Sequence, residues 1–431
     1  MHQHKIEPSR RTALLASLTC SLLALGACGK SPDSVAPQQS NAVLFEGARL
    51  ITGSGSEPIE NSAFVVADGR FAAVGVAGQL AAPEGARRVD LSGATVIPAI
   101  VDAHTHLSTT REALISDLSR RAYYGIGAAL SLGSDDASAP LEIRDEVIPG
   151  AARYRSAGLG ITAPEPGRNE VHWVKTEEAA REAVRAEVAR KVQIVKIWVD
   201  DRDGKYEKLS PALYRAVIDE AHQHDVKVAA HIFALEDAKE LLRAGVDIFA
   251  HGVRDRDIDD EFVALIKERP NVVLIPNLPN RGVAADVSWL AASLSPDELT
   301  KAQASFKEDA KLQAAFGIQA RNLERLAREG VTIAFGTDGN NPWAPHIELE
   351  DVVAAGLSPA DAIVAATRNS AAVFGSNDIG TIEPGKSADF VVLDANPLED
   401  IRNTRRIASV YLRGDSVNRA SNAAADEASG S

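Results

Sequence analysis

Two histidines in the segment 101–107 are the residues whose spacing most clearly suggests chemistry. His104 and His106 stand two positions apart, and residues two apart on a β-strand project to the same side. Their imidazole nitrogens could therefore bind one metal ion, because neutral imidazole is a common ligand of Zn²⁺. The pair by itself predicts a metal site.

Four later segments each place a further candidate ligand at or near the end of an apolar run. These candidates are Lys196 in Gln193-Ile-Val-Lys196-Ile, His231 after Val228-Ala-Ala, His251 after Ile248-Phe-Ala, and Asp338 at the end of Ile333-Ala-Phe-Gly-Thr-Asp338. Together with the histidine pair, the four segments predict the active site of a two-metal hydrolase.

The elements that must position these residues alternate along the chain between residues 95 and 375. Short apolar or β-branched runs predict strands at residues 96–104, 125–132, 153–162, 193–200, 226–233, 247–253, 272–278 and 331–337. Helical patterns lie between them, for example at residues 176–191, 211–224, 234–244 and 301–329. Eight strands that alternate with helices over about 280 residues predict an α/β fold of the (β/α)8 TIM-barrel type. The candidate ligands fall at the carboxyl ends of the strands, where such barrels build their active sites.

Both ends of the predicted folded region contain short alternating runs that are separated by turns. Residues 41–94 and 376–417 each hold too few strands to be stable alone. We therefore expect them to pair into one small β-sandwich, with the hydrolase barrel at residues 95–375 inserted between them. Residues 418–431 are small and polar, which predicts a disordered tail.

The first 28 residues resemble a bacterial lipoprotein signal peptide. Arg10 and Arg11 precede an apolar stretch at residues 13–27, which is shorter than the roughly 20 residues of a transmembrane helix. Cleavage before Cys28 would leave a lipid on this cysteine, and the Ser-, Pro- and Gln-rich residues 29–40 predict a flexible tether. We expect an exported protein on the periplasmic side, anchored by lipid, with Gly29 favouring the outer membrane. An ordinary secretory signal is the alternative, and the general and twin-arginine export routes both fit.

The composition is that of an acidic globular protein. The 431 residues carry a formal net charge of −14, and Lys and Arg form no stripe, which argues against a nucleic-acid partner. The two cysteines, Cys20 and Cys28, both lie in the predicted signal segment. A metal site in the mature domain must therefore use nitrogen and oxygen ligands. The sequence leaves open whether copies of the chain associate.

In their order along the chain, these motifs resemble the amidohydrolase superfamily, and within it the imidazolonepropionase-like and prolidase-like group. The resemblance extends over residues 41–417. It rests on the His-x-His motif at 104–106, Ile-Val-Lys-Ile at 194–197, His231, His251, Gly336-Thr-Asp338, residues 356–362, Ala365-Ala-Thr367 and residues 388–394.

The resemblance implies a binuclear centre, with Zn²⁺ as the expected metal. His104, His106 and Asp338 would hold one ion, and His231 and His251 the other. Lys196 would bridge both ions after CO2 converts its amine to a carbamate. A metal-bridged hydroxide would attack the carbonyl, while Asp338 takes its proton and passes it to the leaving amine. Such an enzyme cleaves an amide C–N bond, and we expect a dipeptide or an N-acyl amino acid as the substrate.

The residues alone leave alternatives open. A lactonase, a phosphotriesterase or a cyclic-amide hydrolase would use the same ligands, and an unmodified Lys196 beside a single ion also fits. Single-metal deaminases of the superfamily usually have a Glu where this chain has Ala234, which counts against deamination. A binding lipoprotein without activity is disfavoured because all the ligands are present.

Several residues in loops and helices could contact the substrate. His346, Arg281 and Tyr214 are the candidates for substrate binding, and Arg254 and Trp343 are two further side chains that could contact a carboxylate or a ring.

Overall fold

A computed structural model describes residues 41–136 and 138–420. The predicted signal peptide with Cys28, the predicted tether and residues 421–431 of the predicted tail lie outside the described residues. The first residues of the predicted tail, 418–420, are described. There the Arg419 guanidinium donates a hydrogen bond to the carbonyl oxygen of Tyr123 at 3.0 Å. Within residues 41–136 and 138–420, no helix is long and apolar enough to cross a membrane.

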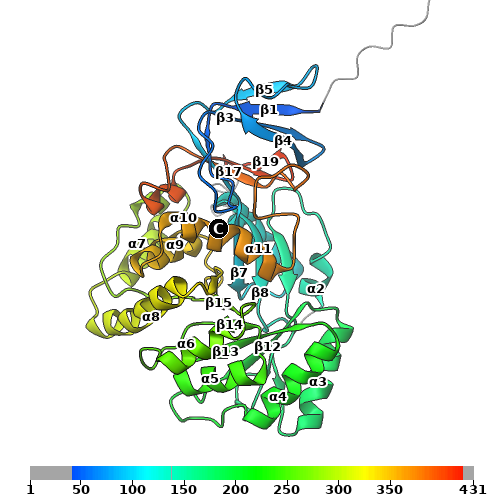
Figure 1. Ribbon diagram of the computed structural model, residues 1–431, viewed down its shortest axis with the longest axis vertical. Helices are drawn as coiled ribbons and strands as arrows, with labels where there is room; N and C mark the ends of the chain where they lie inside the picture. Colours follow the sequence, from blue (N-terminus) through cyan, green and yellow to red (C-terminus); the bar gives the residue numbers. More distant parts are fainter. Residues whose placement is uncertain (1–40, 137, 421–431) are drawn as a thin grey trace, which may run out of the picture. The chain divides into compact units, whose positions relative to one another are not determined.

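Two parallel sheets form the middle of the chain (Figure 1). Their strand orders are β7-β8-β9 and β11-β10-β12-β13-β14-β15-β16. The strands are β7 (Ile100–Thr105), β8 (Ile126–Ser131), β9 (Arg153–Ser156), β10 (Ile161–Thr162), β11 (His172–Trp173), β12 (Ile194–Val199), β13 (Lys227–Ile232), β14 (Ile248–Ala250), β15 (Val273–Ile275) and β16 (Thr332–Ile333). Strands that alternate with helices in this way confirm an α/β, TIM-barrel-like fold.

Helices lie between most of these strands and after β16. Those between the strands are α1 (Arg111–Tyr123), α2 (Ala139–Ile143), α3 (Glu177–Ala189), α4 (Pro211–Gln223), α5 (Leu235–Ala244), α6 (Asp260–Lys267), the 3-10 helix η1 (Ser288–Leu290), α7 (Pro296–Ser305) and α8 (Ala310–Arg328). After β16 come α9 (Ala344–Ala354), α10 (Pro359–Val364), the π-helix η2 (Ala365–Asn369), α11 (Ser370–Phe374) and the 3-10 helix η3 (Ile401–Arg405). Helix α5 shows why they pack. It buries Leu235, Ala238, Leu241 and Leu242, whose spacing of three and four residues makes one apolar stripe.

Three predicted elements are divided in the structure. The strand predicted at 96–104 is two strands in two sheets, because β6 (Thr95–Pro98) pairs with β17 and β7 begins at Ile100. Pro98 has no N–H with which to continue a ladder.

The other two divisions have causes of different kinds, one a tertiary contact and one a helix cap. The strand predicted at 153–162 is divided between β9 and β10 around Gly158, where φ is +65° and a Cβ would meet the Glu187 carboxylate at 1.9 Å. The helix predicted at 301–329 is interrupted after Ser305 and restarts at Ala310, because the Asp309 side chain accepts hydrogen bonds from the N–H groups of Lys311 and Leu312.

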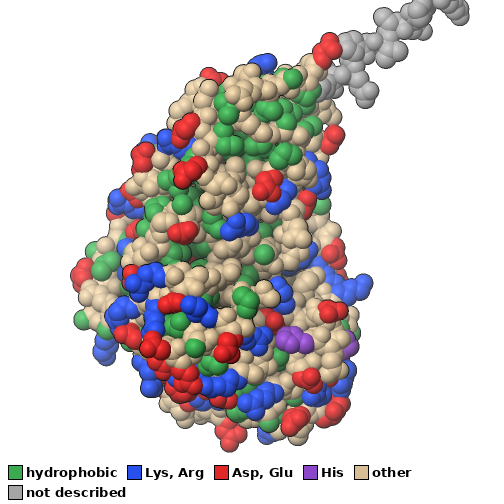
Figure 2. Space-filling model, viewed as in Figure 1, with side chains coloured by type: hydrophobic (Ala, Val, Ile, Leu, Met, Phe, Trp, Pro, Cys, Tyr) green, Lys and Arg blue, Asp and Glu red, His purple; other side chains and the backbone are tan. Residues whose placement is uncertain are grey.

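The two ends of the described chain form two further sheets. The orders are β4-β3-β1-β5 and β19-β18-β17-β6-β2. The strands not yet given are β1 (Val43–Glu46), β2 (Arg49–Leu50), β3 (Ser62–Ala67), β4 (Arg70–Val76), β5 (Arg87–Asp90), β17 (Phe390–Leu393), β18 (Ile407–Leu412) and β19 (Asp415–Ser416). Phe45 and Phe64 from the first sheet contact Phe390 from the second, with ring centroids 5.2 Å apart in both pairs. On the face in Figure 2, hydrophobic side chains gather over these end sheets, and basic and acidic side chains are mixed elsewhere.

Candidate metal centre

The Asp338 carboxylate is the common contact of three predicted histidine ligands. The Nε2 atoms of His104 and His106 each lie 3.1 Å from Asp338 Oδ1, and His251 Nε2 lies 3.5 Å from Asp338 Oδ2. These side chains come from the carboxyl ends of β7 and β14 and from the segment after β16. Ligands that are far apart in the sequence thus meet at one edge of the parallel sheets.

Lys196 and His231 lie beside this carboxylate cluster. Lys196 is fully buried on β12, with Nζ 3.4 Å from His104 Nε2. The His231 ring, on β13, has its centroid 4.5 Å from that of His251. The structure therefore links all the predicted ligands through a continuous set of contacts.

The geometry of the cluster fits a divalent cation. The ligand atoms of His104, His251 and Asp338 all lie within 4.8 Å of one another. Among the described residues, nothing forms a hydrogen bond with the buried Nδ1 atoms of His106 and His251, although buried polar atoms normally have partners. Imidazole nitrogens and carboxylate oxygens are the donors that Zn²⁺ and similar ions take.

The protonation states also fit a cation. Burial lowers the pKa of His104 to about 3 and that of His231 to about 4, so both rings are neutral at pH 7. Burial opposes ionisation of Asp338, but its close contacts with the rings of His104 and His106 outweigh burial and lower the pKa of Asp338. Burial lowers the pKa of the Lys196 amine to about 7, so a large fraction of it is neutral near that pH.

One hydrogen bond and one glycine set the position of the His104 ring. His104 Nδ1 lies 2.8 Å from Asn277 Oδ1, and an Nδ1–H that donates to this oxygen leaves Nε2 as the free lone pair. Gly336 lets the segment after β16 approach β7 closely, because a Cβ at residue 336 would lie 2.6 Å from the Cβ of His104. The ring is therefore fixed on two sides.

Three residues of the site have left-handed backbone conformations that non-glycine residues rarely adopt. The φ angles are +104° at His251, +44° at Asn277 and +55° at Asp338. Such conformations are costly and persist where surrounding contacts over-determine them, which is typical of functional sites.

The sequence interpretation missed two polar residues that support the ligands. Asp200 directly follows β12, and its Oδ2 lies 3.0 Å from His231 Nε2 and accepts a hydrogen bond from Arg202 at 2.8 Å. Asn277 lies two residues beyond β15. Both stand at the carboxyl ends of strands, and this placement was the signal that could have identified them.

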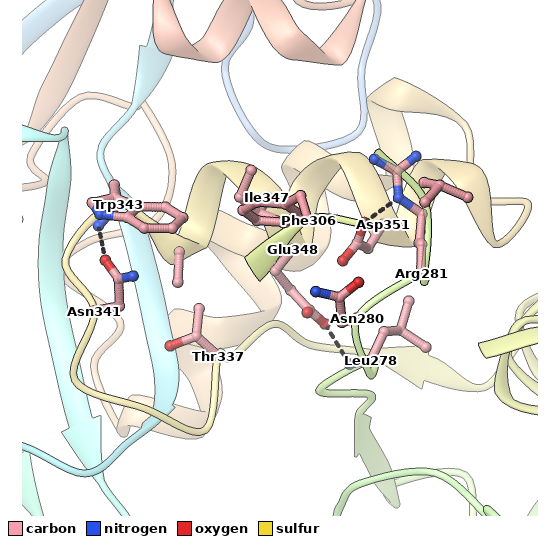
Figure 3. A pocket seen from close by; sticks show the side chains of 12 residues that line it. Leu278, Asn280, Arg281, Phe306, Thr337, Asn341, Trp343, Ile347, Glu348 and Asp351 are labelled. Carbon is pink, nitrogen blue, oxygen red and sulfur yellow. Dashed lines mark hydrogen bonds and ion pairs between the residues drawn. The ribbon is translucent and has the colours of Figure 1, made fainter. Parts of the chain in front are cut away.

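A cavity of about 220 Å³ opens beside the cluster (Figure 3). Thr337 and Leu278, the chain neighbours of Asp338 and Asn277, line it. Trp343, Phe306 and Ile347 form an apolar wall, and Glu348, Asp351 and Arg281 lie further along it. The cavity can hold an apolar group of a molecule whose reacting bond lies at the histidines.

Comparison with known proteins assigns the family. A profile of the amidohydrolase family matches residues 95–417. The chain belongs to the amidohydrolase family. It is a hydrolase that acts on carbon–nitrogen bonds, as the sequence predicted.

Three relatives illustrate the range of this family. An imidazolonepropionase from Deinococcus radiodurans is 27% identical over 389 residues, which are 83% of this chain and 92% of the relative. An ochratoxinase from Aspergillus niger is 25% identical over 425 residues, 84% of this chain and 83% of the relative. A solved structure of a Bifidobacterium longum protein proposed to be a prolidase superposes with a TM-score of 0.72 at 29% identity, covering 91% of this chain and all of that chain.

The three candidates for substrate binding lie in different surroundings in this amidohydrolase. His346 is buried on α9, and its two ring nitrogens lie 3.1 Å from Thr404 Oγ1 and 2.9 Å from the carbonyl oxygen of Tyr124. Tyr214 is buried on the outer helix α4. Neither His346 nor Tyr214 is among the residues that line the cavity beside the cluster. Arg281 does line the cavity, but its guanidinium is paired with Glu350 and Asp351.

Proposed function

We propose that this amidohydrolase uses two divalent ions, Zn²⁺ being the expected metal, to cleave the amide bond of a dipeptide or an N-acyl amino acid. The observation that carries the proposal is the cluster of His104, His251 and Asp338 at the strand ends, with buried Lys196 beside it. The relatives named for imidazolonepropionase, ochratoxinase and prolidase activities support a substrate of small size.

The two ions would be held in two groups. His104, His106 and Asp338 would hold one, and His231 and His251 the other. Lys196 would bridge them as a carbamate: its neutral amine forms a bond to the carbon of CO2 and releases one proton. Burial favours this step because it keeps the amine neutral. When bound, the ions would polarise the carbonyl and acidify water.

Asp338 would move the proton in the reaction. Its carboxylate is ionised and lies between the histidines, so it can take a proton from the attacking water and pass it to the leaving nitrogen as a general base and then acid. Asn277 would hold His104 in the tautomer that leaves Nε2 free. The wall formed by Trp343 and Phe306 would hold an apolar group of the substrate.

Three predictions stay proposals, and the geometry supports the first two of them. The central sheets would close into one (β/α)8 barrel, since Ala103 N donates to the carbonyl oxygen of Phe335 at 2.9 Å and joins β7 to the segment after β16. The end sheets would form a β-sandwich around the Phe45–Phe390 contact. The protein would be attached to the membrane only through a lipid on Cys28, on the periplasmic side, as the sequence of the first 28 residues suggests. Mass spectrometry of the mature amino terminus tests this.

The metal content of the purified protein, measured by inductively coupled plasma mass spectrometry, tests the proposed function. We expect about two ions per chain and cleavage within a panel of dipeptides and N-acyl amino acids. Lys196→Ala should lose both metal and activity. Lys267→Ala, a control at an exposed lysine paired with Glu329, should lose neither. One ion per chain that is unaffected by Lys196→Ala would refute the bridge, and turnover of lactones or phosphotriesters in excess of amides would refute the reaction class.

A further inference from the structure

Arg254 is a cation at the metal centre that has no anionic partner. It stands three residues after His251, on the loop that follows β14. In the described part of the chain, its Nε is buried without a hydrogen bond, and no carboxylate lies within ion-pair distance of its guanidinium, although Asp338 and Asp200 act on it from further away. An arginine that is partly buried without a counter-charge is costly, because guanidinium groups in such places are normally paired.

The other arginines near the cluster differ in this respect. Arg168 stacks on the Trp198 ring and pairs with Glu165, and Arg202 pairs with Glu165 and Asp200. Their donors are thus engaged with protein carboxylates. Arg254 keeps its fork of N–H donors free for an anion from outside the chain.

The loop that carries Arg254 is fixed in place. The buried side chain of Asn322 donates to the carbonyl oxygens of Val253 and Arg256 at 3.1 and 3.0 Å, and accepts from the N–H of Ile258 at 2.8 Å. The N–H of Arg254 donates to the carbonyl oxygen of Phe233 at 2.8 Å. The backbone that carries Arg254 is therefore held on both sides, as the support of a preformed binding group requires.

The charge of Arg254 also reaches the ligands. Burial is the main cause of the low pKa values of Lys196, His231 and His251, and the guanidinium of Arg254 lowers each of them further. The guanidinium therefore lies close enough to the proposed ligands to act on their charges.

We propose that Arg254 binds a carboxylate of the substrate and so restricts this enzyme to amides that have a free carboxylate next to the scissile bond. The inference rests on the proposed function and narrows it: N-acyl amino acids and dipeptides with a free carboxyl end are substrates, and the same molecules with that end blocked are not. A planar guanidinium suits this task because it can donate two parallel hydrogen bonds to one carboxylate.

The test compares acids with their carboxamides. The probes are N-acetyl-L-phenylalanine, N-acetyl-L-proline and glycyl-L-proline, each also as the carboxamide. They are assayed with the wild type, Arg254→Gln, Arg254→Lys and the control Arg256→Gln, an exposed residue two positions along the same loop that pairs with Asp255. We expect Arg254→Gln to lower kcat/KM for the acids by about 10- to 100-fold, mainly through KM, because a charge-assisted hydrogen bond is lost. The carboxamides should change little, Arg254→Lys should recover part of the preference, and Arg256→Gln should match the wild type.

Two further measurements separate the ways in which the proposal can fail. Metal content is measured for each variant, and loss of metal in Arg254→Gln would show that Arg254 supports the centre instead of the substrate. Calorimetric binding of free L-phenylalanine and of its amide gives a result even if no probe is cleaved. Preference of the wild type for the acid, lost in Arg254→Gln, supports the anion site. Equal binding or equal cleavage of acid and amide by the wild type overturns it, whereas failure to cleave any amide counts against the proposed function alone.

Discussion

Removal of the Asn277 side chain should weaken the metal centre without touching a ligand. His104 is fully buried, and its Nδ1 has one partner in the described chain, the Asn277 oxygen at 2.8 Å. Asn277→Ala leaves the ring without this acceptor, so the tautomer with a proton on Nε2 becomes accessible and competes with metal binding. Loss of such a supporting hydrogen bond typically lowers metal affinity by about 10- to 100-fold, or about 1.4 to 2.7 kcal/mol.

The assay is competition for Zn²⁺ with a chromophoric chelator. Asn277→Asp keeps an oxygen acceptor of the same reach and should hold the metal at least as tightly as the wild type. Unchanged affinity in Asn277→Ala, or a large loss in Asn277→Asp, would refute the assigned tautomer.

Three more predictions follow from the same geometry. Asp338→Asn should lower kcat by at least about 100-fold because the proton carrier is lost, and a smaller loss with metal retained would assign proton transfer elsewhere. Gly336→Ala should disrupt the centre, since its Cβ would meet His104 at 2.6 Å, whereas Gly339→Ala, with its nearest neighbour at 3.9 Å, should keep its metal; equal metal contents would contradict the close approach. Burial lowers the pKa of His346 to about 4, so only the unfolded chain binds a proton there between about pH 4 and 6.5, and stability is lost as the pH falls through this window. In urea unfolding of the metal-free protein, this residue should lower the free energy of unfolding by about 1.6 kcal/mol between pH 6.5 and 5, and His346→Gln should remove that loss.

The predictable part of the fold is the part that local pattern controls. Strands such as β12 and β13 are apolar runs between helices with clear stripes, so their positions follow from periodicity. The divisions at Pro98 and Gly158 were not predicted, because an apolar run looks the same whether it forms one strand or two. Gly158 is required by contact with Glu187 from a distant helix, and such tertiary contacts leave no mark in the local sequence.

The residues of the candidate site also differ in how far the sequence could predict them. A ligand such as His231 or His251 could be found because the carboxyl end of a parallel strand is a defined place. Asn277 and Asp200 stand at equally good places, but an amide or a carboxylate after a strand is common, and only the 2.8 Å and 3.0 Å contacts with the histidines show what they do.

The choice among possible substrate contacts shows which physical property decides. Arg254 and Arg281 are the same residue type, and each follows a strand end by a few positions, so the sequence could not rank them. Arg281 already satisfies Glu350 and Asp351, and a substrate carboxylate would have to displace one of these partners. Arg254 has no such partner among the described residues, so an anion gains the full charge-assisted hydrogen bond there. We therefore assign Arg254 to the substrate because its buried N–H donor has no partner among the described residues, and not because of its residue type.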